Sequence, residues 1–227
     1  METQNIDRVD FDESRRVRRF KGGAQAVAFP LGGIGTGNVS VGARGELRDW
    51  EIFNRPAKGN HMPYGFFAIR AQQEGRKAVT KVLESKINPP HTGATGYPAV
   101  DLAGLPRLDS SILEGKYPFV SVEFEDSQLP VKVSMEAFTP LIPLNSDDSG
   151  IPGAVIRYRV KNTSTSATTV SILKPPSLIT RMSNTPLSLM MKRGWSSVPG
   201  PRAVDPVYLL FMPMKFGQEW NTRWPPI

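Results

Sequence analysis

The sequence of 227 residues has no cysteine, only two histidines and no long apolar run. The lack of cysteine excludes a disulfide framework, a thiolate zinc site and cysteine catalysis. His61 and His91, the only histidines, leave little for a transition-metal site. We expect no metal and no cofactor. No run approaches the roughly 18–20 apolar residues of a membrane span. The first residues are polar and lack the apolar core of a signal peptide, so the expected location is the cytoplasm.

The formal net charge of +7 is unevenly distributed along the chain. Residues 1–173 carry 21 basic and 19 acidic side chains, whereas residues 174–227 carry 7 basic and 2 acidic ones. No stripe of basic residues alternates with aromatic residues as a nucleic-acid interface requires. We therefore expect no nucleic-acid partner.

The hydropathy pattern divides the chain into a charged lead-in (residues 1–21), a β-rich part (22–173) and a divergent tail (174–227). In the β-rich part, apolar and polar residues alternate as in half-buried strands. This pattern predicts an all-β fold, an antiparallel and partial β-sandwich. Strands are predicted at residues 64–70, 120–125, 131–136, 154–161 and 170–173. Inward-facing side chains are predicted for Val122, Phe124, Val133, Met135, Ile156 and Tyr158.

Two further segments have less regular patterns. Residues 79–87 fit a strand followed by a bend as well as a short helix. Residues 145–150 (NSDDSG) are predicted as a polar loop whose side chains bond their own backbone.

The tail changes in composition at one point, near residue 174. It holds 9 of the 21 prolines, 5 of the 8 methionines and 3 of the 4 tryptophans. Because proline interrupts both helices and strands, we expect a poorly structured tail. A shift of reading frame explains such an abrupt change, and an authentic divergent extension is the alternative.

Four glycines lie close together in the sequence PLGGIGTGN. A dinucleotide fingerprint would need a further glycine where the chain has Asn38, and a helix where a strand pattern follows. Two interpretations stay open. The cluster is either a close-packed turn between strands or a bare loop that a ligand or second domain can approach.

The next block, residues 44–56, places charged residues around aromatic ones. In a regular strand Asp49 and Glu51 would point to one side, about 6–7 Å apart, which suggests a glycosidase carboxylate pair. Pairing of these acids with Arg44, Arg48 and Arg55 is the stronger interpretation. Trp50 fits a sugar-stacking platform, but a core position is the commoner use. The remaining acids lie beside basic residues or in solvated loops, settings in which no raised carboxyl pKa is expected.

Several separated motifs occur in an order typical of one enzyme family. They are FPLGGIGTG at 29–37, GELRDWEIFN at 45–54, GLPR at 104–107, FVSVEF at 119–124, EAFTPLIPL at 136–144 and DDSGIP at 147–152. Together they resemble the opening of the non-lysosomal glucosylceramidase and β-glucosidase family, glycoside hydrolase family 116. The resemblance extends over about residues 20–173.

The resemblance implies an N-terminal β-sandwich followed by a helical (α/α)6 barrel. In that family the barrel holds the glutamate nucleophile and the aspartate acid/base of a retaining mechanism. The chain ends before such a barrel, so no catalytic residue is assigned and the fragment alone is expected to be inactive. The expected partner is the barrel, and a β-glucoside or glucosylceramide-like substrate is expected only for the complete enzyme.

Bare backbone and paired charge around a tryptophan suit contact with a second domain better than open solvent. The expected domain-junction or substrate-mouth residues are Gly32, Gly33, Gly35, Gly37, Arg48, Asp49 and Trp50. The alternative function is a stand-alone β-sandwich module that binds carbohydrate or a protein. Exposed, coplanar aromatic rings along a groove would indicate that module.

Overall fold

The computed structural model describes residues 17–52, 55–60, 62, 65–87 and 104–173, and the backbone of 196–198, 203–204 and 207–211. His61, His91 and most of the lead-in and tail lie outside the described residues. The described part is almost entirely strands and turns, which confirms the all-β prediction. Within it, no helix is long and apolar enough to cross a membrane.

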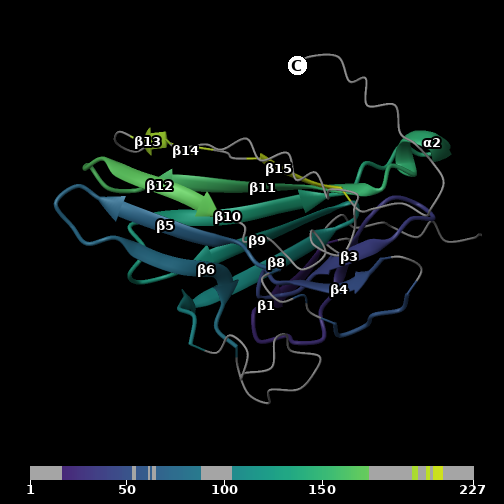
Figure 1. Ribbon diagram of the computed structural model, residues 1–227, viewed down its shortest axis with the longest axis horizontal. Coiled ribbons are helices and arrows are strands. Elements are labelled where there is room, and N and C mark those ends of the chain that lie inside the picture. Colours follow the sequence, from purple (N-terminus) through teal and green to yellow (C-terminus); the bar gives the residue numbers. More distant parts are fainter. Residues whose placement is uncertain are drawn as a thin grey trace, which may run out of the picture.

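The strands form three sheets (Figure 1). The first contains β1 (Arg18–Lys21), β8 (Ser110–Lys116), β9 (Phe119–Glu125), β10 (Val131–Phe138), β11 (Gly153–Asn162), β14 (Ala203–Val204) and β15 (Val207–Phe211). The second contains β13 (Ser196–Val198), β12 (Thr168–Leu173), β5 (Ala68–Gln73), β6 (Val79–Ser85) and β7 (Arg107–Leu108). The third contains β2 (Phe29–Leu31), β3 (Asn38–Val41) and β4 (Leu47–Glu51).

Neighbouring strands are antiparallel, apart from β6 and β7, which pair in parallel. In the first sheet the order is β1-β8-β9-β10-β11, so consecutive hairpins build a meander. The turn after Glu125 joins β9 to β10 with Val133 opposite Phe124, as the hairpin spacing predicts.

One continuous core joins the three sheets. All six side chains that were predicted to face inward are at most 7% exposed. Their sequence neighbours Glu123, Lys132 and Arg159 are exposed, as period two requires. Phe67, just before β5, and Tyr158 on β11 meet across the core with ring centroids 5.2 Å apart. The alternation in the sequence therefore reports the two faces of the first sheet correctly.

Two local predictions differ from the structure. The strand predicted at 64–70 is β5, which starts at Ala68; residue 64 lies outside the described residues, and the Gly65 N–H closes a turn onto the Met62 carbonyl at 2.8 Å. The loop predicted at 145–150 contains one helical turn, α2 (Ser146–Ser149). The side chain of Asn145 accepts a hydrogen bond from the Asp148 N–H at 3.1 Å and so caps this turn. The ambiguous segment 79–87 contains the strand β6.

Of residues 174–227, the structure describes the backbone of three short strands. β13 pairs with β12, and β14 and β15 pair with β11. The rest of the predicted divergent tail lies outside the described residues.

Candidate functional site

The glycine cluster forms the turn between β2 and β3, and close backbone contacts surround three of its glycines. A Cβ atom at Gly32 would collide with the carbonyl oxygen of Gly37. One at Gly33 would collide with the backbone of Gly150 and Ile151, and one at Gly37 would lie 2.9 Å from the Glu51 carbonyl oxygen. At these positions glycine is required by close packing.

The tip of this turn is different. Gly35 has a φ of +73°, and apart from Gly35 and its two chain neighbours no atom lies within 4 Å of the position that its Cβ would occupy. Its neighbour Ile34 is 60% exposed. The turn is thus packed at its base and open at its tip, so each of the two interpretations describes a different part of it.

Hydrogen bonds fix the turn to the rest of the domain. The Gly32 N–H donates to Thr139 Oγ1 at 2.7 Å, and the Ile34 N–H donates to the Ser149 carbonyl at 2.8 Å. Within the turn, Thr36 Oγ1 donates to the Gly33 carbonyl at 2.9 Å. The open tip is therefore held in place by the segment that follows β10.

A bulge in β4 changes the expected placement of the neighbouring carboxylates. Arg48 lies opposite Ser40 and Glu51 opposite Asn38, so both Asp49 and Trp50 are accommodated between these two pairs. Asp49 has a φ of 52°, outside the strand region. Residues 49–51 therefore do not form the regular strand that would place the Asp49 and Glu51 side chains on one side. The hypothesis of a glycosidase carboxylate pair depended on that strand and is not supported.

Both carboxylates have basic or amide partners. Asp49 Oδ1 accepts a hydrogen bond from the Gly59 N–H at 2.6 Å and lies 3.6 Å from Arg48 Nε. Glu51 pairs with Lys58 at 2.8 Å, and this hydrogen bond lowers the pKa of Glu51. An acid held ionised in this way is unsuited to donate a proton to a leaving group.

Trp50 is a core residue. Its side chain is buried, and its Nε1–H donates to the Leu47 carbonyl at 3.4 Å. A Cβ at Gly65 would lie 3.5 Å from the ring. The indole therefore offers no face for stacking on a sugar.

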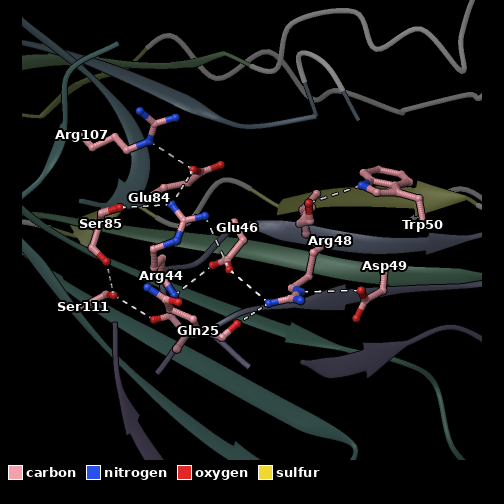
Figure 2. Close-up of polar contacts among 12 residues, drawn as sticks. Gln25, Arg44, Glu46, Arg48, Asp49, Trp50, Glu84, Ser85, Arg107 and Ser111 are labelled. Atoms are coloured by element: carbon pink, nitrogen blue, oxygen red, sulfur yellow. Dashed lines mark hydrogen bonds and ion pairs between the residues drawn. The ribbon is translucent and has the colours of Figure 1, made fainter. Parts of the chain in front are cut away.

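Figure 2 shows a buried ionic cluster that the sequence did not predict. The Arg44 guanidinium lies 3.6 Å from Glu46 Oε1 and 3.4 Å from Glu84 Oε2, and Arg107 Nε lies 3.4 Å from the same Glu84 oxygen. Each of these four side chains is at most 5% exposed. The cluster links the β3–β4 turn to β6 and β7.

Sequence reasoning assigned Arg44 to the wrong acids. Its ion pairs are with Glu46 and Glu84, not with Asp49 or Glu51. Nothing in the local pattern pairs Arg44 with Glu84 on β6. The available signal was that Glu46 and Arg107 both lie in motifs that carry the family resemblance, about 60 residues apart.

Burial raises the pKa of Glu46, and the Coulomb interaction with Arg44 opposes this shift. Repulsion from Glu84 raises the pKa further, whereas Arg48 lowers it. The expectation that no setting here raises a carboxyl pKa is therefore wrong for Glu46. Full desolvation outweighs the neighbouring guanidinium groups.

This shift predicts how stability depends on pH. A folded-state pKa above the ordinary 4.5 means that the unfolded chain releases the Glu46 proton first. Between 4.5 and the folded-state value, this group therefore lowers the free energy of unfolding as pH rises, by up to about 1.4 kcal/mol per pH unit. In urea titrations, Glu46→Gln should match the unmodified chain near pH 4.5 and exceed its stability increasingly as pH rises. A constant difference across this range would contradict the assignment.

The groove and the exposed ring pairs in the described residues do not resemble a sugar site. A groove of about 690 Å³ is lined by eleven residues, among them Phe20, Phe29 and Tyr117, and no carboxylate is among them. The Phe29 and Tyr117 rings are tilted by 36°, and those of Phe119 and Phe138 by 41°. The coplanar platform that would indicate a stand-alone carbohydrate module is not found in either pair.

Metal chemistry also finds no support in the described part of the chain, where no group of three or more His, Asp or Glu residues could hold a metal ion. In the cluster of Figure 2, the carboxylates are paired with guanidinium groups. These groups supply the positive charge that a metal ion would otherwise provide.

A family model described as beta-glucosidase 2, glycosyl-hydrolase family 116, N-terminal domain matches residues 28–175. The match covers more than half of the chain and includes the glycine turn, the β4 bulge and the ionic cluster. It also ends close to the change in composition at residue 174. The chain belongs to glycoside hydrolase family 116, of which it carries the N-terminal domain.

Proposed function

We propose that residues 22–173 are a scaffold domain that supports the catalytic (α/α)6 barrel of a retaining β-glucosidase or glucosylceramidase-type enzyme. The match to the N-terminal domain of family 116 is the observation that carries this proposal. The stand-alone binding module is not favoured, because the exposed ring pairs are tilted.

The proposed junction with the barrel, or the mouth of its substrate site, includes the glycine turn. Gly32, Gly33 and Gly37 fix the base of the turn, and Gly35 leaves the backbone of its tip accessible. Arg48, Asp49 and Trp50 are buried and not part of an exposed surface, since each is at most 4% exposed. Their proposed role is to hold β4 and the turn in position for the second domain.

Hydrolysis with retention needs two carboxylates about 5–5.5 Å apart in different environments, with the sugar between them. In the described residues, Glu46 has a raised pKa, as the general acid of a glycosidase requires. However, Glu46 is only 2% exposed and pairs with Arg44. Glu51 is more accessible, but its pKa is lowered. These environments support the proposal that both catalytic carboxylates belong to the barrel.

The 227-residue chain alone is therefore expected to hydrolyse no β-glucoside. The test is an assay of the purified chain with an aryl β-glucoside, beside an intact family 116 enzyme as the positive control. Turnover above background that disappears in Asp49→Asn or Glu51→Gln would move catalysis into this domain and contradict the proposal.

The proposal extends to the substrate, the location and the tail. The substrate of the complete enzyme would be a β-glucoside or a glucosylceramide-like lipid. The enzyme would be located in the cytoplasm, since a chain without cysteine has no disulfide that needs an oxidising compartment. Residues 174–227 would be the product of a shifted reading frame, with an authentic divergent extension as the alternative. Translation of the downstream coding DNA in the other two frames tests this, and the frame shift is refuted if neither continues the family sequence.

A further inference from the structure

Three exposed apolar side chains gather around α2 and the tip of the glycine turn. Ile34 is 60% exposed, Ile142 48% and Leu144 109%. Ser149 connects two of them, because its carbonyl accepts the Ile34 N–H at 2.8 Å and its Oγ accepts the Ile142 N–H at 2.9 Å. Ile34 is distant in sequence from Ile142 and Leu144, but Ser149 joins its segment to theirs by hydrogen bonds. The three exposed side chains are here called the Leu144 surface.

Leu144 combines two unfavourable features. Its φ of 65° is in the left-handed region, which residues with a Cβ seldom adopt and which asparagine or glycine tolerates better. Its side chain is also fully exposed to solvent. Neither feature stabilises the domain itself, so a role in binding accounts for them better than a role in folding.

The backbone around Leu144 is rigid. The Asn145 N–H donates to the Ile142 carbonyl at 3.1 Å, and Ser149 Oγ donates to the same carbonyl at 3.0 Å. The Gly150 N–H closes α2 onto the Ser146 carbonyl at 2.8 Å. A backbone held in this way loses little conformational freedom on binding.

We propose that the Leu144 surface is where the catalytic domain docks, with Leu144 as its central anchor. This inference rests on the proposed scaffold function, because the Leu144 surface continues from the tip of the glycine turn. Asp147 and Asp148 are exposed at its border. The fitting partner surface is therefore an apolar pocket on the catalytic domain that is bordered by lysine or arginine side chains.

The strain at Leu144 allows a test that separates docking from folding. Leu144→Asn places a residue that tolerates the left-handed region at the same position. Its stability in urea should therefore equal or exceed that of the unmodified chain. Its affinity for a separately produced family 116 catalytic domain, measured by titration calorimetry, should fall at least tenfold.

The matched control is Leu173→Asn, because Leu173 is also 60% exposed but lies on β12. This variant should bind the catalytic domain as tightly as the unmodified chain. If Leu144→Asn binds equally well, the docking surface is refuted and the scaffold function stands. If the unmodified chain binds no catalytic domain, both are refuted. Self-association through Leu144 in sedimentation experiments would assign the surface to a second copy and overturn the proposed partner.

Discussion

Replacement of Arg44 by methionine is expected to lower the free energy of unfolding by about 3–5 kcal/mol, measured by urea denaturation at pH 7. Arg44 is the guanidinium shared by Glu46 and Glu84, at 3.6 and 3.4 Å. Its removal leaves two buried carboxylates with fewer positive neighbours. Loss of one partner from a buried ion pair costs more than loss of the whole pair, because the other charge stays desolvated.

Two further variants test this explanation. The exposed pair of Arg19 and Glu114, at 3.0 Å, provides the control, and Arg19→Met should cost less than about 1 kcal/mol. The double variant Arg44→Met/Glu46→Gln removes one carboxylate charge together with the guanidinium. It should recover part of the stability lost in Arg44→Met. Equal losses in the single and double variants would show that packing, not charge, explains the effect.

Trp50→Ala is expected to lower the free energy of unfolding by about 3–5 kcal/mol, because it removes a large buried side chain. The indole is 4% exposed and lies beside Gly65 and the Leu47 carbonyl. Trp50→Phe keeps a ring in this space and loses the Nε1 hydrogen bond, so its cost should be about 1–2 kcal/mol. Thermal and urea unfolding of the two variants provide the measurements.

The control for Trp50 is Tyr117→Ala, since Tyr117 is an aromatic residue that is 57% exposed. Its effect should remain within about 1 kcal/mol. If Trp50→Ala in an intact family 116 enzyme altered substrate affinity without any loss of stability, Trp50 would act directly at the junction or the substrate site. Our account predicts that any kinetic effect accompanies a loss of stability.

The strands of the first sheet could be predicted because one face of each is buried. Val122 and Phe124 alternate with polar neighbours, and Met135 and Tyr158 repeat this pattern on the adjoining strands. Period two in a sequence reports such a face directly. It does not report exceptions to the period, and this is why the bulge at Asp49 and the single turn of α2 were missed.

The ionic cluster was missed for a different reason. Arg44, Glu84 and Arg107 are brought together by the pairing of the β3–β4 turn, β6 and β7, which no local pattern encodes. Charged residues are normally expected in solvent, so nothing in their sequence context predicted their burial. In the glycine turn, the sequence identified the bare backbone but could not distinguish the packed base from the open tip at Gly35.

Reconstitution tests the central claim most directly. The 227-residue chain and a separately produced family 116 catalytic domain are assayed with an aryl β-glucoside, alone and mixed, and the mixture is analysed by gel filtration. The scaffold account predicts no turnover by the chain, low turnover by the catalytic domain, and a complex with increased turnover in the mixture. A catalytic domain that is fully active alone and forms no complex with the chain would contradict it.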